Sequence, residues 1–174
     1  MGNKTLGVFG FEIIRNYTNG LNVERASLRD AYDIHEIINY FADEGEMLHR
    51  TIDEINQNIN DFVVVKNKTG NLIATAALHK LDDKLGEIKG VAVKENWQGQ
   101  GVGSILIQSC LQDALKLGIN EIFVLTNKPE FYNKMGFSLS NVTKFPIKIW
   151  SECIGCSKFF SCNEIIMSID IDPN

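Results

Sequence analysis

The chain has 174 residues, which is enough for one domain with a substantial core. Apolar residues make up 44% of it and charged residues 22%, as is typical of globular proteins, and no apolar run approaches the roughly 20 residues that a membrane-spanning helix needs. A formal net charge of -5 at pH 7 argues against a general nucleic-acid-binding protein. No signal-peptide pattern is present, so we expect a cytoplasmic protein with reduced thiols.

The first twenty residues have no clear hydrophobic period and end in the turn signal Thr18–Gly20. We interpret 1–20 as an N-terminal arm of unknown role and 21–174 as a single domain, because no linker or repeat interrupts the rest of the chain.

Periodicity and turn residues then predict an alternation of strands and helices. Helices are predicted at 30–41, 52–59, 102–117 and 130–135, and strands at 21–25, 62–65, 72–78, 85–93, 121–125, from 137 onward and at 164–169. Thr51 and Glu54 have the spacing of a capping box at the start of the second helix, and Gly118 is placed to end the third. This order predicts a mixed α/β fold with a strand–helix–strand crossover.

A glycine-rich loop, NWQGQGVGS at residues 96–104, precedes the longest predicted helix. The first N–H groups of a helix have no internal partner, and the helix dipole is positive there. Without Cβ atoms at Gly99, Gly101 and Gly103, a bulky phosphate can approach these groups. The spacing fits neither the dinucleotide fingerprint nor a P-loop. The alternative is a flexible surface turn before a helix.

Three segments in chain order resemble the GNAT acetyltransferases. QGQGVG at 98–103 fits the pattern [Gln/Arg]-x-x-Gly-x-[Gly/Ala] that holds the pyrophosphate of acetyl-CoA, EIKGVAV at 87–93 is similar to the fourth strand, and FYNKMGF at 131–137 resembles the signature at the far end. The resemblance implies a central mixed, mostly antiparallel twisted sheet flanked by helices, with strands four and five splayed around acetyl-CoA.

The resemblance also implies where acetyl-CoA lies. Its pantetheine arm would pair with the fourth strand like an added strand, and its thioester would lie between strands four and five. The cofactor-binding residues that follow are Val91, Ala92, Val93, Gln98, Gly99, Gln100, Gly101, Val102, Gly103, Ser104 and Lys134.

Four further segments are similar to short bacterial and archaeal N-acetylglutamate synthases. They are EMLHRT at 46–51, FVLT at 123–126, FPIKIW at 145–150 and the cysteine-rich segment 153–164. The likeness covers about residues 21–169 and lacks the amino-acid kinase domain of longer synthases. It implies acetyl transfer to the α-amine of L-glutamate, in arginine biosynthesis. His49 stands where that family has Pro and Ile147 where it has His, so another small amine stays open as the acceptor.

A glutamate acceptor needs its two carboxylates bound and its amine left free. Arg50 is the first candidate, because a guanidinium matches a carboxylate with two hydrogen bonds, and Lys148 is the second. The likeness adds Thr126 to the substrate-binding residues. The alternative for both cations is a solvated surface position. Arg50 also argues against a polyamine acceptor, which would require an acidic pocket.

Acetyl transfer to an amine requires a base for the ammonium and a proton for the departing thiolate. Glu87, on the strand beside the thioester, is the candidate base, and an exposed strand-edge carboxylate is the alternative. Tyr132 is the candidate acid, and core packing is its alternative. Positioning of the two substrates can supply about 7–11 kcal/mol, so we expect direct attack without a covalent enzyme intermediate.

Cys153, Cys156 and Cys162 form a C-x2-C-x5-C cluster. A structural zinc needs four ligands, so half of such a motif favours reduced structural thiols over zinc. Cys110 lies on the apolar stripe of a predicted helix and is expected in the core.

A reading outside the enzyme class is a sensor that binds acetyl-CoA or responds to metal through the cysteines. Retention of both Glu87 and Tyr132 favours catalysis. By analogy with the family we expect a homodimer acting on a small amine, with no nucleic-acid or membrane partner.

Overall fold

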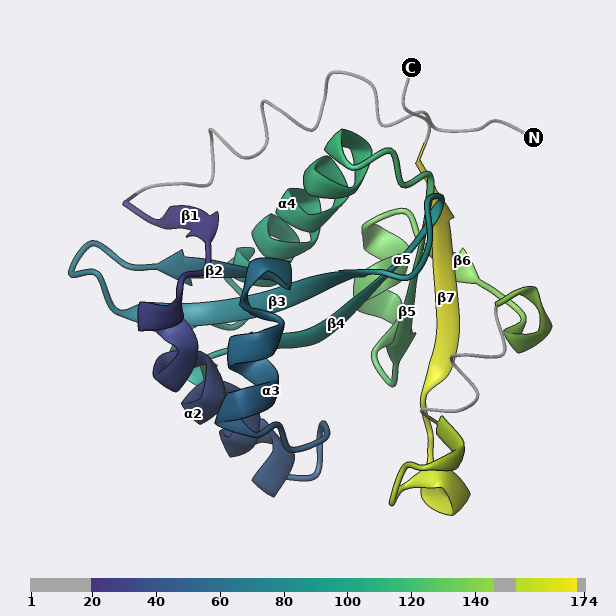
Figure 1. Cartoon of the computed structure of the whole chain (residues 1–174), viewed down its shortest axis with the longest axis horizontal. Coiled ribbons are helices and arrows are strands. Elements are labelled where there is room, and N and C mark those ends of the chain that lie inside the picture. The colour runs from purple at the N-terminus through teal and green to yellow at the C-terminus, as the bar shows by residue number, and fades with distance from the viewer. Residues whose placement is uncertain (1–19, 146–152, 172–174) are drawn as a thin grey trace.

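The computed structural model describes residues 20–145 and 153–171, which form one seven-stranded sheet with helices on both faces (Figure 1). The strands are β1 (Asn22–Arg25), β2 (Phe62–Lys66), β3 (Leu72–Lys80), β4 (Leu85–Val93), β5 (Glu121–Thr126), β6 (Ser138–Leu139) and β7 (Ile165–Asp170). The α-helices are α2 (Ala31–Asp43), α3 (Ile52–Gln57), α4 (Val102–Lys116) and α5 (Pro129–Lys134). None of the helices in the described ranges is long and apolar enough to cross a membrane.

The sheet has the strand order β1-β2-β3-β4-β5-β7-β6. All neighbouring strands are antiparallel except β4 and β5, which are joined in parallel through the crossover helix α4. β4 pairs with β5 only from Leu85 to Glu87, although β4 continues to Val93. The two strands therefore diverge beyond Glu87, and the predicted mixed fold with splayed fourth and fifth strands is confirmed.

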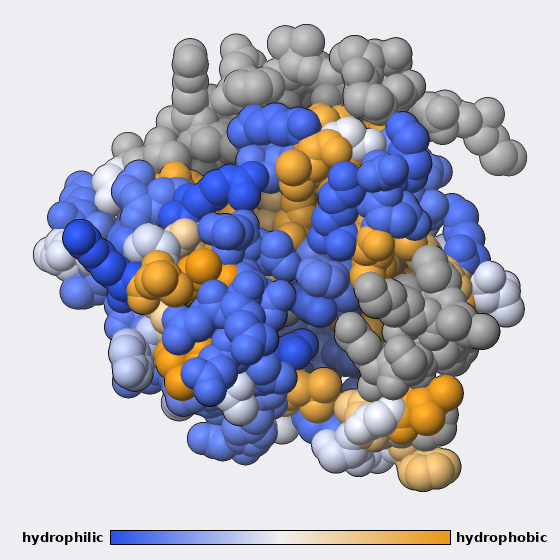
Figure 2. Space-filling view, viewed as in Figure 1, coloured by the Kyte–Doolittle hydropathy of each residue, from blue (hydrophilic) through white to orange (hydrophobic). Residues whose placement is uncertain are grey.

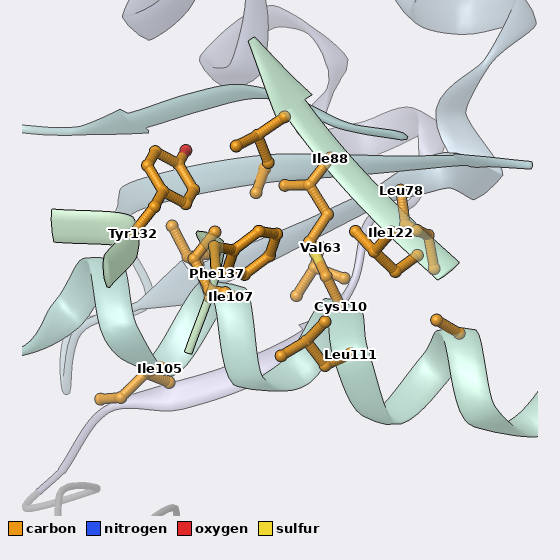
Figure 3. Packing of buried hydrophobic residues seen from close by; sticks show 14 of the residues in the cluster. Val63, Leu78, Ile88, Ile105, Ile107, Cys110, Leu111, Ile122, Tyr132 and Phe137 are labelled. Carbon is orange, nitrogen blue, oxygen red and sulfur yellow. The ribbon is translucent and has the colours of Figure 1, made fainter. Parts of the chain in front are cut away.

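The two faces of the sheet carry separate apolar layers. Figure 3 shows Val63, Leu78 and Ile88, from β2, β3 and β4, packed with Cys110 and Leu111 of α4. The alternate residues of β2 face the opposite layer, which contains the buried side of α2. A strand buried on both faces explains why β2 reads as a continuous apolar run rather than an alternation.

Most predicted element boundaries agree with the structure to within one or two residues. The capping box is present, with the Thr51 hydroxyl accepting from Glu54 N at 3.2 Å and Thr51 N donating to the Glu54 carboxylate at 2.7 Å. Gly118 follows α4 with φ +74°, as expected for a residue after a helix end. The prediction was less accurate at 52–59, where α3 ends at Gln57 and a 3-10 turn, Ile59–Asp61, follows.

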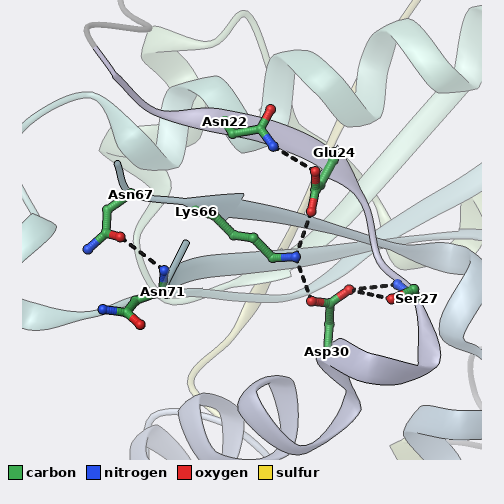
Figure 4. Close-up of polar contacts among 7 residues, drawn as sticks. All are labelled: Asn22, Glu24, Ser27, Asp30, Lys66, Asn67 and Asn71. Carbon is green, nitrogen blue, oxygen red and sulfur yellow. Dashed lines mark hydrogen bonds and ion pairs between the residues drawn. The ribbon is translucent and has the colours of Figure 1, made fainter. Parts of the chain in front are cut away.

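An ion-pair network holds β1 and the entry to α2 against β2 (Figure 4). The Lys66 ammonium lies 2.6 Å from the Glu24 carboxylate and 2.7 Å from that of Asp30. Burial alone would raise the pKa of Asp30, but hydrogen bonds from Lys66 and from Ser27 lower it below its usual value. Hydrogen bonds to Asp30 and Glu24 raise the pKa of Lys66.

Candidate active site

The divergence of β4 from β5 opens a cavity of about 490 Å³ beside the glycine loop, called here the glycine-loop cavity. Gly90, with φ +62°, lies where the pairing of β4 with β3 shifts register, so a bulge bends β4 at this point. The second half of β4 thus turns its backbone edge toward the cavity instead of toward β5.

The glycine loop has the backbone that its sequence predicts. Gly99 and Gly101 have φ values of +71° and +83°, a region that L side chains rarely adopt, and Gly101 is the N-cap of α4. A Cβ on Gly99 would meet nothing within 4 Å, so this side of the loop is open. The Gln98 side chain donates to the Val93 carbonyl at 2.9 Å and fixes the loop to the end of β4.

Gly103 has an additional role in packing. A Cβ at this position would lie 3.2 Å from Cζ of Phe131, so its absence lets α4 approach α5. Part of the glycine pattern therefore reflects helix packing rather than room for a phosphate.

Nine of the predicted cofactor residues line the glycine-loop cavity: Val91, Ala92, Val93, Gln98, Gly99, Gly101, Gly103, Ser104 and Lys134. The Val102 side chain is buried in the core, and the Gln100 amide donates to the Asn96 carbonyl at 2.8 Å. In these two residues, the main-chain N–H groups are the atoms that can hydrogen-bond a phosphate.

A second cavity, of about 510 Å³, lies beside the first and is called the Arg50 cavity. Figure 2 shows a recess on this face between the layer of α2 and α3, which is largely hydrophilic here, and the segment 153–163, which exposes Ile154 and Phe160. The two cavities share part of their walls, namely Glu46, Met47, Ile88, Lys89, Gly90, Leu125, Asn127 and Glu164. Molecules bound in the two cavities would therefore meet where β4 leaves β5.

Arg50 is held in the wall of the second cavity by its backbone. Asn39 of α2 donates to the Arg50 carbonyl at 2.9 Å and accepts from Arg50 N at 3.0 Å. The α3 capping box follows directly, so both sides of Arg50 are fixed. Its side chain also lines a third cavity, of about 270 Å³, called the His79 cavity.

The loop before Arg50 is tied to the opposite side of the opening by two lysines. Lys128 lies 3.0 Å from the Glu46 carboxylate, and Lys158 donates to the carbonyls of Gly45 at 2.7 Å and Met47 at 3.3 Å. These contacts join the α2 side of the molecule to the β5 and β7 side across the Arg50 cavity.

His49, which departs from the family pattern, lines neither of the two large cavities. It pairs with Asp43 at 2.7 Å and its side chain is 64% exposed. Ile147, the second departure, and Lys148, the second predicted acceptor cation, lie outside the described residues.

Glu87 is buried, with 7% of its surface exposed, and lines the Arg50 cavity. This burial rules out the alternative of an exposed strand-edge carboxylate. The Lys89 ammonium lies 3.6 Å from the Glu87 carboxylate, on the same side of β4. A buried carboxylate at the wall of a cavity is placed to accept a proton from a bound molecule.

Tyr132 is both a core residue and a cavity residue. Its ring packs edge to face against Phe131 and Phe137, with centroids 5.0 and 5.4 Å away. The residue also lines the glycine-loop cavity, and in Figure 3 its hydroxyl points away from Phe137. Burial raises the pKa of Tyr132 well above its usual value, so the phenol stays protonated and able to donate.

Thr126, at the end of β5, is buried and lines the glycine-loop cavity. Its hydroxyl accepts from Lys128 N at 2.9 Å, which shapes the turn from β5 to α5. Thr126, predicted as a substrate-binding residue, therefore belongs to the glycine-loop cavity and is not among the residues that line the Arg50 cavity.

Two residues that sequence reasoning did not select lie in the shared wall. Glu164, just before β7, lines both cavities, and burial raises the pKa of its carboxyl although Lys158 acts in the opposite direction. Lys89 lines all three cavities. Side chains alternate between the two faces of a strand, so Lys89 lies on the same face of β4 as Glu87. This alternation is the feature of the sequence from which Lys89 could have been selected.

Cys153, Cys156 and Cys162 line the Arg50 cavity as free thiols. Within residues 20–145 and 153–171, no group of three His, Cys, Asp or Glu side chains has the geometry to hold a metal ion. Cys110 is fully buried, as predicted, and burial raises the pKa of its thiol to about 12.

Comparisons with known proteins agree with this geometry. A family model described as the acetyltransferase (GNAT) family matches residues 28–137. An N-acetyltransferase of Chlorobaculum tepidum is 37% identical over 145 residues, which are 83% of this chain and 93% of that protein. The amino-acid acetyltransferase of Mycobacterium tuberculosis is 27% identical over 150 residues, or 82% of this chain and 86% of that one.

Other relatives are longer proteins. The chain is 28% identical to the amino-acid acetyltransferase of Proteus mirabilis over 72% of its own length but only 29% of that protein. The structure of N-acetylglutamate synthase from Neisseria gonorrhoeae with coenzyme A and N-acetyl-glutamate superposes with a TM-score of 0.80 at 24% identity, covering 87% of this chain and 35% of that one. A Mycobacterium tuberculosis protein in complex with CoA has a TM-score of 0.76 at 26% identity and covers 87% and 99%.

Proposed function

The chain belongs to the GNAT acetyltransferase family, and from this premise we propose that it transfers the acetyl group of acetyl-CoA to the α-amine of L-glutamate. The observation that carries the proposal is the pair of cavities that meet where β4 leaves β5, with the glycine loop at one and Arg50 at the other. Relatives named amino-acid acetyltransferase support an amino-acid acceptor. A place in arginine biosynthesis follows if the acceptor is glutamate.

The glycine-loop cavity suits acetyl-CoA, which would supply the activated acetyl thioester. Main-chain N–H groups of the loop and of the first turn of α4 would bind its pyrophosphate. The β4 edge at Val91–Val93, no longer paired with β5, would hydrogen-bond the pantetheine arm. This places the reacting carbonyl at the shared wall of the two cavities.

The reaction needs three proton transfers, because two protons leave the acceptor nitrogen and one joins the departing thiolate. Glu87, directly or through a water molecule, takes the proton of the acceptor ammonium, and the neutral amine nitrogen then attacks the thioester carbonyl carbon. The C–N bond forms, the C–S bond breaks, and the Tyr132 hydroxyl donates its proton to the departing thiolate. The acetylated nitrogen loses its second proton, directly or through water, to the Tyr132 oxygen, which restores the phenol. Glu87 is in the wall of the Arg50 cavity and Tyr132 in that of the glycine-loop cavity, so acid and base approach from opposite sides.

The acceptor would occupy the Arg50 cavity. Arg50 offers a planar two-point match to a carboxylate, and the fixed backbone around it favours a defined orientation. On the basis of the sequence alone, we propose that Lys148 is a further contact of the acceptor.

The test is thiol release from acetyl-CoA with each of the twenty amino acids, spermidine and lysine-containing peptides. We expect release with glutamate, and we expect Arg50→Ala to raise the KM for glutamate by about tenfold or more, because a charged hydrogen bond is lost. Arg29→Ala, at an exposed position on the turn before α2, is the matched control and is expected to leave KM unchanged.

The other outcomes separate the alternatives. Release with a different amine would support acetyl transfer but would show that the acceptor is not glutamate. No release with any amine, despite measurable acetyl-CoA binding, would favour a sensor.

A further inference from the structure

Lys89 occupies a central position among the cavities. It contributes to the walls of the glycine-loop cavity, the Arg50 cavity and the His79 cavity, whereas Arg50 contributes only to the last two. Lys89 therefore lies nearer than Arg50 to the place where the thioester and the acceptor amine would meet.

The shape of β4 fixes this position. Lys89 pairs with Ala77 of β3 just before the register shift and is followed by Gly90 with its positive φ. Its ammonium lies 3.6 Å from the Glu87 carboxylate, and its side chain is 25% exposed. The lysine is thus held on the same side of the strand as the candidate base.

Two other described lysines in the cavity walls hold the loop before Arg50. Lys158 donates to the carbonyls of Gly45 and Met47, and Lys128 is paired with Glu46. Besides Lys158, the described cations in the wall of the Arg50 cavity are Arg50 and Lys89, and the Lys89 ammonium lies 3.6 Å from Glu87. These two residues offer one cation for each carboxylate of an acceptor that has two.

The order of groups in an α-amino acid then assigns the two cations. The α-carboxylate is one bond from the carbon that carries the amine, whereas the distal carboxylate of glutamate lies several bonds further away. The amine must reach Glu87 and the thioester, so the α-carboxylate falls beside Lys89 and the distal carboxylate extends toward Arg50.

We propose that Lys89 is the specificity-determining residue for α-amino acids, because it binds the acceptor's α-carboxylate while Arg50 binds the distal one. This inference rests on the proposed amino-acid acetyltransferase function. The inference predicts different roles for the two residues: Lys89 binds every α-amino acid, whereas Arg50 contributes to the binding of acidic ones alone.

Three ligands separate these roles. L-Glutamate has both carboxylates, L-glutamine keeps only the α-carboxylate, and 4-aminobutyrate keeps the amine and the distal carboxylate. The experiment measures kcat/KM for glutamate and glutamine, and the inhibition constant of 4-aminobutyrate against glutamate, in the wild type and in Lys89→Met.

We expect Lys89→Met to lower kcat/KM for glutamate and for glutamine by a similar factor of about tenfold or more, because each loses the same charged hydrogen bond. The inhibition constant of 4-aminobutyrate should change less than about twofold, because this ligand has no α-carboxylate to lose contact with Lys89. An effect of the substitution on Glu87 or on the fold would weaken the binding of 4-aminobutyrate as well. Lys89→Arg should recover most of the activity. Lys80→Met is the matched control. Lys80 ends the neighbouring strand β3, pairs with Asp83 in the turn that follows, and lines none of the three cavities, so kcat/KM for glutamate and for glutamine should stay unchanged.

Two results would overturn the inference: a loss confined to glutamate, which would assign Lys89 to the distal carboxylate, or an equal weakening of 4-aminobutyrate. If Lys89→Met does not fold, the polar and uncharged Lys89→Gln gives the same comparison. The wild type tests the function separately. If the wild type releases thiol with a different α-amino acid, glutamate is replaced as the proposed acceptor and the Lys89 comparison is made with that amino acid. If no α-amino acid gives release, both the proposed function and the role of Lys89 are overturned.

Discussion

At the scale of single residues, burial determines what Tyr132 can do. A phenol packed between Phe131 and Phe137 loses little by being neutral and much by being charged, so its pKa rises. It stays a proton donor through the whole range in which an amine is acetylated. The sequence alternatives for this residue, core packing and acid catalysis, are therefore compatible: the ring packs and the hydroxyl reaches the cavity.

Tyr132→Phe should lower kcat by about 10²-fold and leave both KM values nearly unchanged, because the proton for the thiolate is lost while binding is kept. The residual rate should come from positioning of the substrates. Steady-state kinetics with saturating acetyl-CoA measures the effect, and a melting temperature close to that of the wild type would confirm that the ring still packs. An unchanged kcat would remove Tyr132 from the mechanism.

At the scale of elements, the glycine loop joins β4 to α4 with a backbone that side chains disfavour. Gly99 has a positive φ and open space around its Cβ position, next to the glycine-loop cavity. Gly70, in the turn between β2 and β3, has a similar φ of +83° and equally open space, but it does not line that cavity. Comparing substitutions at these two glycines therefore separates the stability lost through backbone strain from the affinity lost through cofactor contacts.

Gly99→Ala and Gly70→Ala should each destabilise the fold by about 1 kcal/mol, because both force an L side chain into the left-handed region. Only Gly99→Ala should also raise the KM for acetyl-CoA, because its methyl group enters the cofactor side of the loop. Urea unfolding and acetyl-CoA titration of the two variants make the comparison. Equal KM values would show that the loop does not hold the cofactor.

At the scale of the whole molecule, Lys66 joins three parts of the chain. Its ion pairs reach Glu24 on β1 and Asp30 at the entry to α2 (Figure 4). The same helix α2 carries Asn39, whose side chain holds the Arg50 backbone. The network thus connects the edge of the sheet to the element that supports the candidate acceptor site.

The network should make stability pH-dependent. The pKa of Asp30 is lowered from 3.8, so its contribution is present above that value and is lost as the pH falls through the folded-state pKa. The pKa of Lys66 is raised from 10.5, so its contribution is complete below that value and is lost only as the pH rises beyond it. Between these limits the ion pairs are fully formed.

Lys66→Met should therefore destabilise the protein by about 2 kcal/mol at pH 7, because it leaves the buried Asp30 carboxylate without its cation. The difference from the wild type should be smaller at about pH 3, below the ordinary carboxyl pKa of 3.8, because the contribution of the Lys66–Asp30 pair is lost as the pH falls through the folded-state pKa of Asp30. Lys84→Met, at an exposed position, is the control. Denaturant unfolding at the two pH values measures this, and a difference that is independent of pH would contradict it.

The sequence by itself determined the elements and the family. Hydrophobic periods locate α2, α4 and the strands because burial of one face or both is a local pattern. The capping box at Thr51 and the glycines of the loop are equally local, because each depends on backbone geometry within a few residues. The order of these elements was enough to predict the mixed α/β fold, and the resemblance of three segments to the GNAT acetyltransferases implied where acetyl-CoA would lie.

Only the tertiary structure decided how the site is assembled. Lys89, Glu164 and Arg50 come from segments far apart in the chain, and whether their side chains meet depends on register, on the bulge at Gly90 and on the point at which β4 leaves β5. Periodicity says which face a residue occupies but not which distant residue it will face. Burial, which raises the pKa of Tyr132 and of Glu164, likewise arises from packing between elements and has no signature in a single segment.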